Sequence, residues 1–557
     1  MSHLIAIAVG PVQEFIAAAR RTRDLWFGSH LLSEVSRAVA IAVEYNGGKL
    51  IFPATTKAEN VANVILAELP DGDPKEVARK AREAAQERWL QFAADAWSEA
   101  SEVIRREIWK EQVDDVIEFY AAWVTRSDNY KKDREKVMRL LAGRKSFRDF
   151  QPAKGRAGVP KSSLDGQRES VLKDPAREAW PERYRARLRV REGEQLDVVA
   201  MVKRVAGGNK PYPSIARIAA DPWVRGNRNR LGDVISACEK LAEEEIIRPL
   251  KTTEHPQFSD FPFEGTAVYT SRHHELIEET GAASDSLKAL QQALKGLEPE
   301  PYLAVLVADG DKMGEALSAL NSPEHHREFS QRLAEFAGEA KNIVTNCNGV
   351  LVYAGGDDVL AFLPVDKYLD CARQLHDKFA DLLKSYGDLT LSVGVAIGHF
   401  MENLEDLLEY GRQAEKSAKK PDRNGLAVHL HKRGGAPIKI RSSWKDDPDH
   451  RLKHFAGLMK TGIIPSKLPY ELRTLARLYE SWTASAETVI RQDLFRLIAK
   501  KTSDGSVSVR EALSNYLGGL DATKLMILAR ELLIARQMAT TLRQIDGPPA
   551  RTKEVTS

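Results

Sequence analysis

The chain has 557 residues, of which 43% are hydrophobic and 29% are charged. This composition predicts several folded domains with sizeable cores and excludes wholesale disorder. The formal net charge is only +3. A chain with this charge is not globally basic, so any nucleic-acid binding would need a local basic patch or charge supplied by partner subunits.

Cysteine content and hydropathy limit the compartment. The three cysteines, Cys238, Cys347 and Cys371, show no Cys-x-x-Cys spacing, which argues against a four-cysteine zinc site and a disulfide framework. Few cysteines that stay reduced are typical of the cytosol. No apolar run approaches the roughly 18 residues that a membrane-spanning helix needs. We therefore expect a cytoplasmic protein that has no membrane segment and no signal peptide.

The first 70 residues predict a small α/β unit. An apolar run at residues 4–9 ends at Gly10-Pro11, which is typical of a buried strand. The following patterns predict helices from Val12 and over residues 31–44, and short strands over residues 49–52 and 61–69.

Residues 74–141 have a different character. They are rich in Ala, Glu, Arg and Leu and contain no Gly or Pro after Pro74, which predicts a long helical insertion. We assign residues 1–205 to a first domain that includes this insertion. Residues 206–300 are expected to form a mostly helical middle domain.

Five arginines alternate with mostly apolar residues over residues 183–191. Period two predicts a strand with its arginines on one face. This face could be a solvated edge that is protected by charge, or it could contact a phosphate backbone. The sequence leaves both interpretations open.

A second α/β unit follows over residues 301–440, and the remaining residues, 441–557, have a helical pattern. The order of the expected elements is β-α-β-β-α-β, the ferredoxin-like arrangement. The expected strands lie at residues 302–308, 350–353, 359–363 and 389–397, and the expected helices at 312–320, 329–344, 366–383 and 404–419. The fold class is therefore α+β with several domains.

A weak internal repeat relates the two units. Residues 4–10 align with residues 303–309, which sets Gly10 opposite Asp309 and Val12 opposite Asp311. If the two units are copies, only the second has acidic side chains at these positions. The alternative is that any two buried strands resemble each other.

The sharpest chemical signal is a pair of acidic clusters. Asp309-Gly310-Asp311 ends an apolar strand, and Gly355-Gly356-Asp357-Asp358 occupies a predicted hairpin tip. These strands are neighbours in a β-α-β-β unit, so the carboxylates can converge. Converging carboxylates repel each other unless a cation holds them. Oxygen ligands of this kind suit Mg²⁺ or Mn²⁺ with phosphate in the coordination shell.

The glycines of the hairpin have their own role. Gly355 and Gly356 permit a tight turn and a close approach of the backbone to a triphosphate. Such sequences are also common in ordinary turns. Weaker candidates for chemistry are His376-Asp377, interpreted as an exposed helical pair, and the pairs His273-His274 and His325-His326, which lack a carboxylate pattern.

These residues carry a family resemblance. The chain resembles the large polymerase/cyclase-like subunit of type III CRISPR–Cas effector complexes, in the Cmr (type III-B) branch. The resemblance covers most of the first 440 residues, and the C-terminal helical region fits only by position and composition. Four motifs occur in the family's order, at residues 10–29, 161–170, 308–314 and 353–358.

The resemblance implies two palm domains that face each other with ATP between them. The implied activity is conversion of ATP into cyclic oligoadenylate after the complex captures target RNA. The implied metal ligands and catalytic residues are Asp309, Asp357 and Asp358. The implied contacts to ATP are Gly310, Asp311, Gly355, Gly356 and Lys419, although Asp311 could instead stabilise its turn and Lys419 could be a solvated lysine at a helix end.

Partners and departures also follow from the resemblance. The expected partners are the other Cmr subunits, the guide RNA and the target RNA. Many relatives begin with a His-Asp nuclease domain, which we do not expect here because the first palm strand begins at about Leu4. Many relatives also bind zinc in the middle segment, where this chain has Ser162 and Asp165 in place of cysteines, so zinc is not expected.

Two alternatives remain. One is a stand-alone palm-type synthase of cyclic dinucleotides, such as a diguanylate cyclase, although that family has Glu where Asp358 stands. The other is a catalytically silent scaffold that binds RNA and partner subunits.

Overall fold

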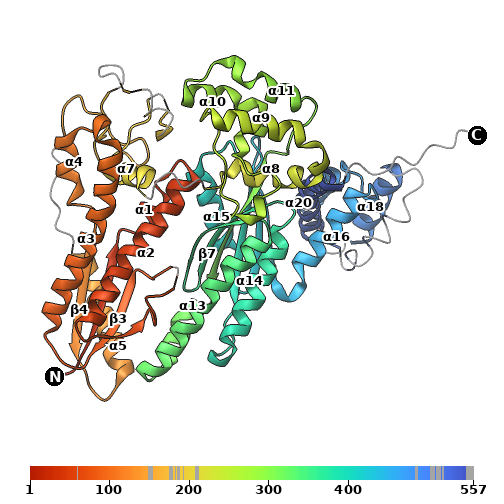
Figure 1. The fold of residues 1–557 in the computed structure, drawn as a ribbon. Helices are drawn as coiled ribbons and strands as arrows, with labels where there is room; N and C mark the ends of the chain where they lie inside the picture. Colours follow the sequence, from red (N-terminus) through yellow and green to blue (C-terminus); the bar gives the residue numbers. More distant parts are fainter. Residues whose placement is uncertain are drawn as a thin grey trace, which may run out of the picture.

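The computed structural model gives a multidomain α+β chain, as the sequence predicts (Figure 1). A first sheet lies at one end of the molecule, a larger second sheet lies in the centre, and the C-terminal helices lie at the other end. The structure describes the chain except for residues 59, 148–154, 175–179, 182–183, 185–187, 192, 207–211, 483–486, 502–508, 510–512, 514–515, 517, 519 and 547–557.

The first sheet has four antiparallel strands in the order β2-β3-β1-β4. Alternate residues of the central strand β1 enter two separate cores, because neighbouring side chains of a strand face opposite sides. One core packs under α2 and α3, and the other packs under α5. The elements are β1 His3–Gly10, α1 Gln13–Ala17, α2 Thr22–Tyr45, β2 Lys49–Phe52, β3 Val64–Leu69, α3 Pro74–Ala100, α4 Arg106–Val113, β4 Glu118–Thr125 and α5 Tyr130–Ser146.

The predicted helical insertion over residues 74–141 is wrong in one respect. It contains β4, which pairs with β1 along its whole length. The segment is therefore the second half of a complete β-α-β-β-α-β unit and not an insertion into it. The strand-forming Phe, Tyr, Trp, Val and Thr of Glu118–Thr125 supply the physical reason, since these side chains fit a pleated, half-buried surface.

The second sheet has six strands in the order β10-β9-β8-β5-β7-β6. Four of them, β8-β5-β7-β6, repeat the order of the first sheet, so the two units share one topology. The other two, β9 and β10, were not predicted, and a boundary at residue 440 would cut β10. The elements are β5 Tyr302–Gly310, α12 Met313–Ala319, α13 Pro323–Asn346, β6 Val350–Gly355, β7 Asp358–Pro364, α14 Tyr368–Leu383, β8 Leu391–His399, α15 Leu404–Ala418, β9 Gly425–Leu430 and β10 Ile438–Ser443.

Helices cover both faces of the second sheet. One face packs on α13, α14 and the C-terminal helices, and the other packs on α15 and the middle helices. The C-terminal helices are α16 Pro448–Lys460, α17 Leu468–Leu478, α18 Glu487–Lys501 and α20 Ala522–Asp546. The middle segment has short helices: α7 Val198–Val205, α8 Ile215–Gly226, α9 Gly232–Glu243, α10 His273–Thr280 and α11 Lys288–Ala293.

The predicted arginine-faced strand over residues 183–191 is wrong where the structure describes it. Tyr184 and Leu188 have helical backbone, and both are buried in the core under α2 and α3. Two helical residues four positions apart share one face, which explains their common burial. Three of the five arginines lie outside the described residues, and the other two, Arg189 and Arg191, make internal contacts.

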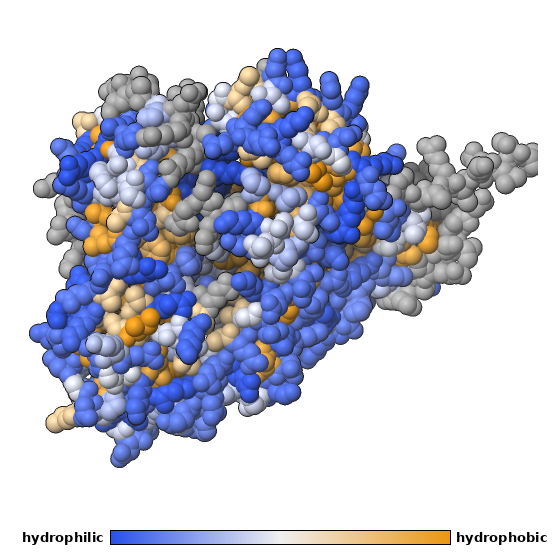
Figure 2. Space-filling view, viewed as in Figure 1, coloured by the Kyte–Doolittle hydropathy of each residue, from blue (hydrophilic) through white to orange (hydrophobic). Residues whose placement is uncertain are grey.

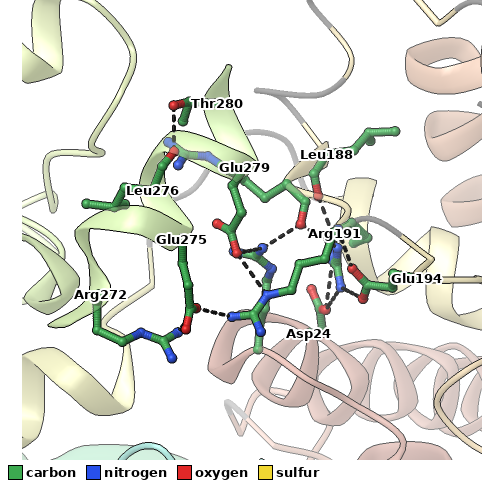
Figure 3. Close-up of polar contacts among 12 residues, drawn as sticks. Asp24, Leu188, Arg191, Glu194, Arg272, Glu275, Leu276, Glu279 and Thr280 are labelled. Carbon is green, nitrogen blue, oxygen red and sulfur yellow. Dashed lines mark hydrogen bonds and ion pairs between the residues drawn. The ribbon is translucent and has the colours of Figure 1, made fainter. Parts of the chain in front are cut away.

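Ion pairs join this segment to α10, and a neighbouring buried group joins α7 to α2 (Figure 3). The Arg191 guanidinium lies 2.7 Å from Glu275 and 3.2 Å from Glu279, both on α10. Beside them, the Arg204 guanidinium lies between Asp24 at 2.8 Å and Glu194 at 3.1 Å. All three side chains of this second group are almost fully buried, so their charges depend on one another.

Polar contacts also join α13 to the edge of the first sheet. The Tyr130 hydroxyl and the His326 Nδ1 are 2.7 Å apart, and both side chains are buried. Arg327 donates to the Leu50 carbonyl at 2.7 Å, and its guanidinium lies 2.5 Å from Glu68. These contacts fix how the two β-α-β-β-α-β units face each other.

Hydropathy and cysteine state complete the description. Hydrophilic residues dominate the surface in Figure 2, with hydrophobic residues in small separate patches. Over the described ranges, no helix is both long enough and apolar enough to cross a membrane. Cys238, Cys347 and Cys371 are buried free thiols.

The buried group at Arg204 generates a stability prediction. Arg204→Met should lower the free energy of unfolding by about 3–5 kcal/mol, because Asp24 and Glu194 would remain buried without a cation. The matched control is Arg156→Met, which removes a more exposed pair with Glu111 and should cost less than about 1 kcal/mol. Urea unfolding followed by tryptophan fluorescence measures both, and equal losses in the two variants would contradict the prediction.

Candidate functional site

Two acidic residues from separate strands meet on one face of the second sheet. β5 and β7 are antiparallel, with Ala308 paired to Val359. Extending this register by one residue places Asp309 opposite Asp358. Directly opposed residues of an antiparallel pair point to the same face, with Cβ atoms roughly 5 Å apart. The neighbouring residues Ala308 and Val359 enter the core on the opposite face. Asp309 and Asp358 therefore lie on the face that α15 covers.

Gly310 lets Asp357, at the hairpin tip, approach the end of β5. A Cβ atom at this position would lie 2.8 Å from the Asp357 Cβ and 2.9 Å from the Phe379 ring. Both distances are too short for carbon atoms, so only glycine lets the end of β5 approach the hairpin this closely. The missing side chain of Gly310 thus lets Asp357 lie against the end of β5, next to the Asp309–Asp358 pair. A metal site shared by Asp309, Asp357 and Asp358 stays a prediction.

The hairpin that carries the other two carboxylates has a two-residue loop. Gly355 pairs with Asp358, which leaves Gly356 and Asp357 at the tip. Gly356 has φ of +71°, a left-handed conformation at the first loop position, where hairpin turns favour glycine. Below the tip, the Tyr353 hydroxyl donates to the Gly355 carbonyl at 3.4 Å. Burial and both aspartates raise the pKa of Tyr353, so this phenol stays protonated.

Burial and neighbouring carboxylates disfavour the ionised forms of the acids at this site. Burial, followed by the charge of Asp358, raises the pKa of Asp357 to about 7. Part of Asp358 is exposed, but the surrounding protein still desolvates its carboxylate and raises its pKa to about 6. Burial and the same aspartate raise the pKa of Glu415 on α15. At neutral pH this group of acids thus holds protons that an added cation would displace.

Lys419 supplies the positive charge at this site. Its ammonium group contacts the Asp309 carboxylate and lies 3.3 Å from Glu415. Burial and the nearby Arg423 lower the pKa of Lys419. The sequence left two interpretations of Lys419 open, a site residue or a solvated lysine at a helix end. The structure places its side chain against the acidic cluster.

Asp311 has a different environment from Asp309. It is 1% exposed, and its two carboxylate oxygens accept hydrogen bonds from the Ser392 hydroxyl at 2.8 and 2.9 Å. The Thr390 hydroxyl at 2.8 Å and the Asn424 backbone N–H at 3.0 Å also donate to it. A carboxylate with this many donors has little capacity left for a cation or a phosphate. Of the two predicted roles, the structure favours stabilisation of the turn.

The hydrogen bond from Asn424 has a further consequence. Arg423 and Asn424 both adopt the left-handed backbone conformation, with φ of +60° and +44°. Residues with a Cβ atom adopt it only when other contacts hold them there. Asp311 holds the loop that follows α15, and the Arg423 N–H donates to the Lys419 carbonyl at 3.0 Å. Asp311 is therefore a positioning residue for Lys419.

Sequence reasoning missed several residues of this site. Glu415, Ser392 and Asn424 reach it from three different elements, and no local pattern marks them. Glu415 had one available signal, because it lies four residues before Lys419 on a helix and four-residue spacing places side chains side by side.

The weaker histidine candidates have structural roles. His376 and Asp377 do form a pair, with His376 Nδ1 2.9 Å from the exposed Asp377 carboxylate. The interpretation is wrong for the His376 ring, which is mostly buried and has its Nε2 2.9 Å from the Asn424 side-chain oxygen. His273 contacts the Ala267 carbonyl at 2.8 Å. His326 belongs to the contact between α13 and the first sheet.

The donor set fits a magnesium-type ion that is completed by substrate. In the part of the chain that the structure describes, no three His, Cys, Asp or Glu side chains form a ready-made metal cage. Mg²⁺ commonly binds through one or two carboxylates together with substrate phosphates and water. Asp309, Asp357 and Asp358 offer oxygen donors of this kind, and burial raises the pKa of both Asp357 and Asp358.

Comparisons with known proteins agree with this geometry. Residues 302–427 match the family model of the Cas10/Cmr2 second palm domain, and residues 4–94 match the model of the CRISPR-associated protein Cmr2 N-terminal region. Two separate regions of the chain thus match domain models of the Cas10/Cmr2 family. Both of its β-α-β-β-α-β units fall within these matched regions or begin there. The acidic cluster and its hairpin lie inside the second palm domain.

One curated relative is the Cmr subunit Cmr2 of Pyrococcus furiosus, which is 24% identical over 547 residues. The alignment covers 78% of this chain and 62% of the relative, so the chain spans less than two thirds of that protein's length.

Two solved structures share the fold. They are a type III-B Cmr-beta assembly in the apo state, with a TM-score of 0.65, and the same assembly bound to cognate target RNA, with a TM-score of 0.64. Each match is 14% identical and covers 88% of this chain, and 77% or 78% of the matched chain.

The role of Asp311 is testable without any activity assay. Asp311→Ala should lower the free energy of unfolding by about 1–3 kcal/mol, since Ser392, Thr390 and the Asn424 N–H lose a buried acceptor. Hydrogen exchange at the Asn424 amide should accelerate at the same time. Asp381→Asn, on an exposed helix face, is the control and should leave this exchange unchanged. Unaltered exchange in Asp311→Ala would contradict the positioning role.

Proposed function

We propose that this chain is the large subunit of a type III-B CRISPR effector complex and that it makes cyclic oligoadenylate from ATP when the complex captures target RNA. The observation that carries the proposal is the register that sets Asp309 opposite Asp358, with Asp357 beside them at the hairpin tip and Lys419 in contact with Asp309. A subunit that acted only as a scaffold would gain nothing from carboxylates that raise one another's pKa.

The triphosphate of ATP would bind at the hairpin tip. Gly356 keeps the tip free of a Cβ atom, so the backbone can lie close to the phosphates. Lys419 now contacts Asp309. An arriving triphosphate would attract its ammonium group and free the Asp309 carboxylate for a cation. Nucleotide and cation would then bind together, and each would favour the other.

The chemistry is a repeated phosphodiester condensation. The 3′-oxygen of one ATP forms a bond to the α-phosphorus of another, the bond from that phosphorus to the bridging oxygen of pyrophosphate breaks, and the hydroxyl proton passes to solvent. The same step between the two ends of a linear product closes the ring. A bound Mg²⁺ or Mn²⁺ pair would neutralise the charge that develops on the attacking and leaving oxygens.

The first palm would act as the other wall of the site. Its β1 ends at Gly10, the position that corresponds to Asp309, and carries no carboxylate there. The two units share one strand order, but only the second has the acidic cluster. We therefore infer one catalytic centre per chain, with the first palm orienting the second ATP. The guide RNA, the target RNA and the other Cmr subunits are the proposed partners.

The decisive experiment uses the assembled complex. ATP, Mg²⁺ or Mn²⁺ and cognate target RNA are added, and the products are identified by mass spectrometry. We expect cyclic oligoadenylates from the unaltered complex, at least a hundredfold less from Asp357→Ala/Asp358→Ala, and normal amounts from the control Asp381→Asn. Cyclic di-GMP made by the isolated chain would indicate a stand-alone synthase, and no nucleotide product at all would indicate a scaffold.

Cation binding should release protons. Since the pKa of Asp357 is about 7 and that of Asp358 is about 6, the pair is partly protonated at pH 6.5, and a bound cation requires both to be ionised. Titration calorimetry with Mn²⁺ and a non-hydrolysable ATP analogue, in two buffers of different ionisation enthalpy, should show about one proton released at pH 6.5 and fewer at pH 8.5.

The same pKa shifts affect stability without a cation. Because the folded-state pKa values are raised, ionisation of the pair destabilises the fold as pH rises through about 6 to 7. Asp357→Asn should therefore raise the melting temperature at pH 8 and should abolish the further stabilisation by Mn²⁺ that the unaltered chain shows. A melting temperature of Asp357→Asn below that of the unaltered chain at pH 8 would contradict this interpretation.

A further inference from the structure

An exposed tyrosine on the C-terminal helices is surrounded by cations. Tyr470 lies near the start of α17, and 36% of its surface is exposed. Three cations approach its ring from three different elements. The distances to the ring centroid are 6.0 Å for Lys432 in the loop after β9, 5.7 Å for Arg473 on α17 and 5.5 Å for Arg536 on α20.

Hydrogen bonds fix this tyrosine in place. Its hydroxyl oxygen accepts from the Arg536 guanidinium at 3.2 Å and from the Lys432 ammonium at 3.4 Å. The contacts link α17, α20 and the loop after β9 into one surface. A ring that is held by its hydroxyl end while its face is partly exposed is already ordered for a stacking partner, so little side-chain entropy remains to be lost on binding.

The three cations lack acidic partners. Within the described part of the chain, no Asp or Glu carboxylate lies within 4 Å of Lys432, Arg473 or Arg536, although most buried and half-buried arginines elsewhere pair with an acid. Glu300 lies near Arg536, but burial raises its pKa and its side chain bonds to Gln537. Three like charges around one ring repel each other, and an anion between them would relieve this repulsion.

The basic character continues along the surface. Arg477 is exposed on α17, seven residues after Tyr470, and therefore on the same helical face. In the loop after β9, Arg433 is exposed, and the half-buried His431 stacks on Tyr410 with ring centroids 3.7 Å apart. Further cations and rings thus occur on α17 and in the loop after β9, beyond Tyr470 itself.

This surface is distinct from the acidic cluster. The loop after β9 lies next to Tyr302 at the beginning of β5, because Arg433 of this loop is close enough to influence the pKa of Tyr302. Asp309 lies at the other end of the same strand. A nine-residue strand is about 25 Å long, so the surface and the cluster occupy opposite ends of the second sheet.

We propose that Tyr470, Lys432, Arg473 and Arg536 bind a single-stranded polynucleotide, with its phosphates on the three cations and one base stacked on the exposed ring. Proteins that bind single strands combine these two features, a cationic track and an aromatic platform. An acidic protein would satisfy the charges but would leave the ring unused. The inference is independent of ATP chemistry at Asp309, because it concerns binding at the far end of the sheet.

The test measures binding by the full chain. Fluorescent fifteen-residue oligouridine and oligothymidine are titrated with the chain over a series of KCl concentrations, and the anisotropy is recorded. Lys432→Gln/Arg473→Gln/Arg536→Gln should weaken binding and reduce the slope of log Kd against log salt by about 2, at roughly 0.7 per lost phosphate contact. Tyr470→Ala should weaken binding by about 5- to 100-fold, and Tyr470→Phe should weaken it much less.

The controls separate this surface from general charge effects. Arg79→Gln/Arg332→Gln/Lys384→Gln removes three exposed cations that lie on other helices and pair with acids close in sequence. This triple variant should leave the slope almost unchanged. Thermal unfolding checks that all variants fold, and photocrosslinking of 5-bromouridine RNA should label the peptide that contains Tyr470. Equal binding by the two triple variants, or equal binding by Tyr470→Ala and the unaltered chain, would overturn the proposal.

Cyclic oligoadenylate synthesis provides a separate readout. The surface variants can be assayed for products in the same complex as the Asp357→Ala/Asp358→Ala variant. Loss of oligonucleotide binding with an active catalytic centre would support the surface and would leave the proposed reaction intact. An inactive unaltered complex whose isolated chain still binds oligonucleotides through Tyr470 would refute the reaction and retain the surface.

Discussion

The repulsion between carboxylates at the end of β5 is the constraint on which the site depends. β5 pairs on one side with β7 and on the other with β8, so backbone hydrogen bonds fix the end of this strand from both sides. The register then forces Asp309 opposite Asp358, and the missing side chain of Gly310 lets Asp357 come closer still. The sheet thus uses its backbone pairing to hold together charges that would otherwise separate.

A fixed excess of negative charge needs a counter-charge that can leave. Lys419 meets this need because it lies at the end of α15 on a long side chain, and its ammonium group contacts Asp309 and Glu415. Asp311 makes the opposite contribution. It is buried, it accepts hydrogen bonds from three donors at fixed places, and it holds the loop that follows Lys419. Asp309 thus contacts Lys419 at the site, whereas Asp311, two residues later, supports the surrounding loop.

The sequence was sufficient to predict the elements with a strong local signal. The two acidic clusters, the hairpin and the order of the second unit follow from short apolar runs and from glycine placement, and the structure has them. The strands β4 and β9 were missed for different reasons. β4 lies in a segment whose pattern is dominated by the Ala-rich helix α3 and the Lys- and Arg-rich helix α5. All six residues of β9 are buried, so no alternation marks it.

The remaining features depend on contacts between distant segments, so local sequence patterns could not predict them. Asp309 and Asp311 follow the same strand and look alike in sequence, and only Ser392, Thr390 and Asn424, about 80 to 110 residues further on, distinguish a buried anchor from a site residue. The arginines at 183–191 alternate in the way a strand would. Their described members instead end on α10 and on the carbonyls of Glu245 and Ile246, which no local period can reveal.

Charges are separated along the second sheet. Acidic side chains gather where β5 ends, at Asp309 and Asp358, and the cations Lys432, Arg473 and Arg536 gather near its beginning. A polyanion would be repelled at the first region unless a cation is bound there, and it would be attracted at the second. If both proposals hold, the chain would bind a long nucleic acid at one end of the sheet and a small, metal-bound triphosphate at the other.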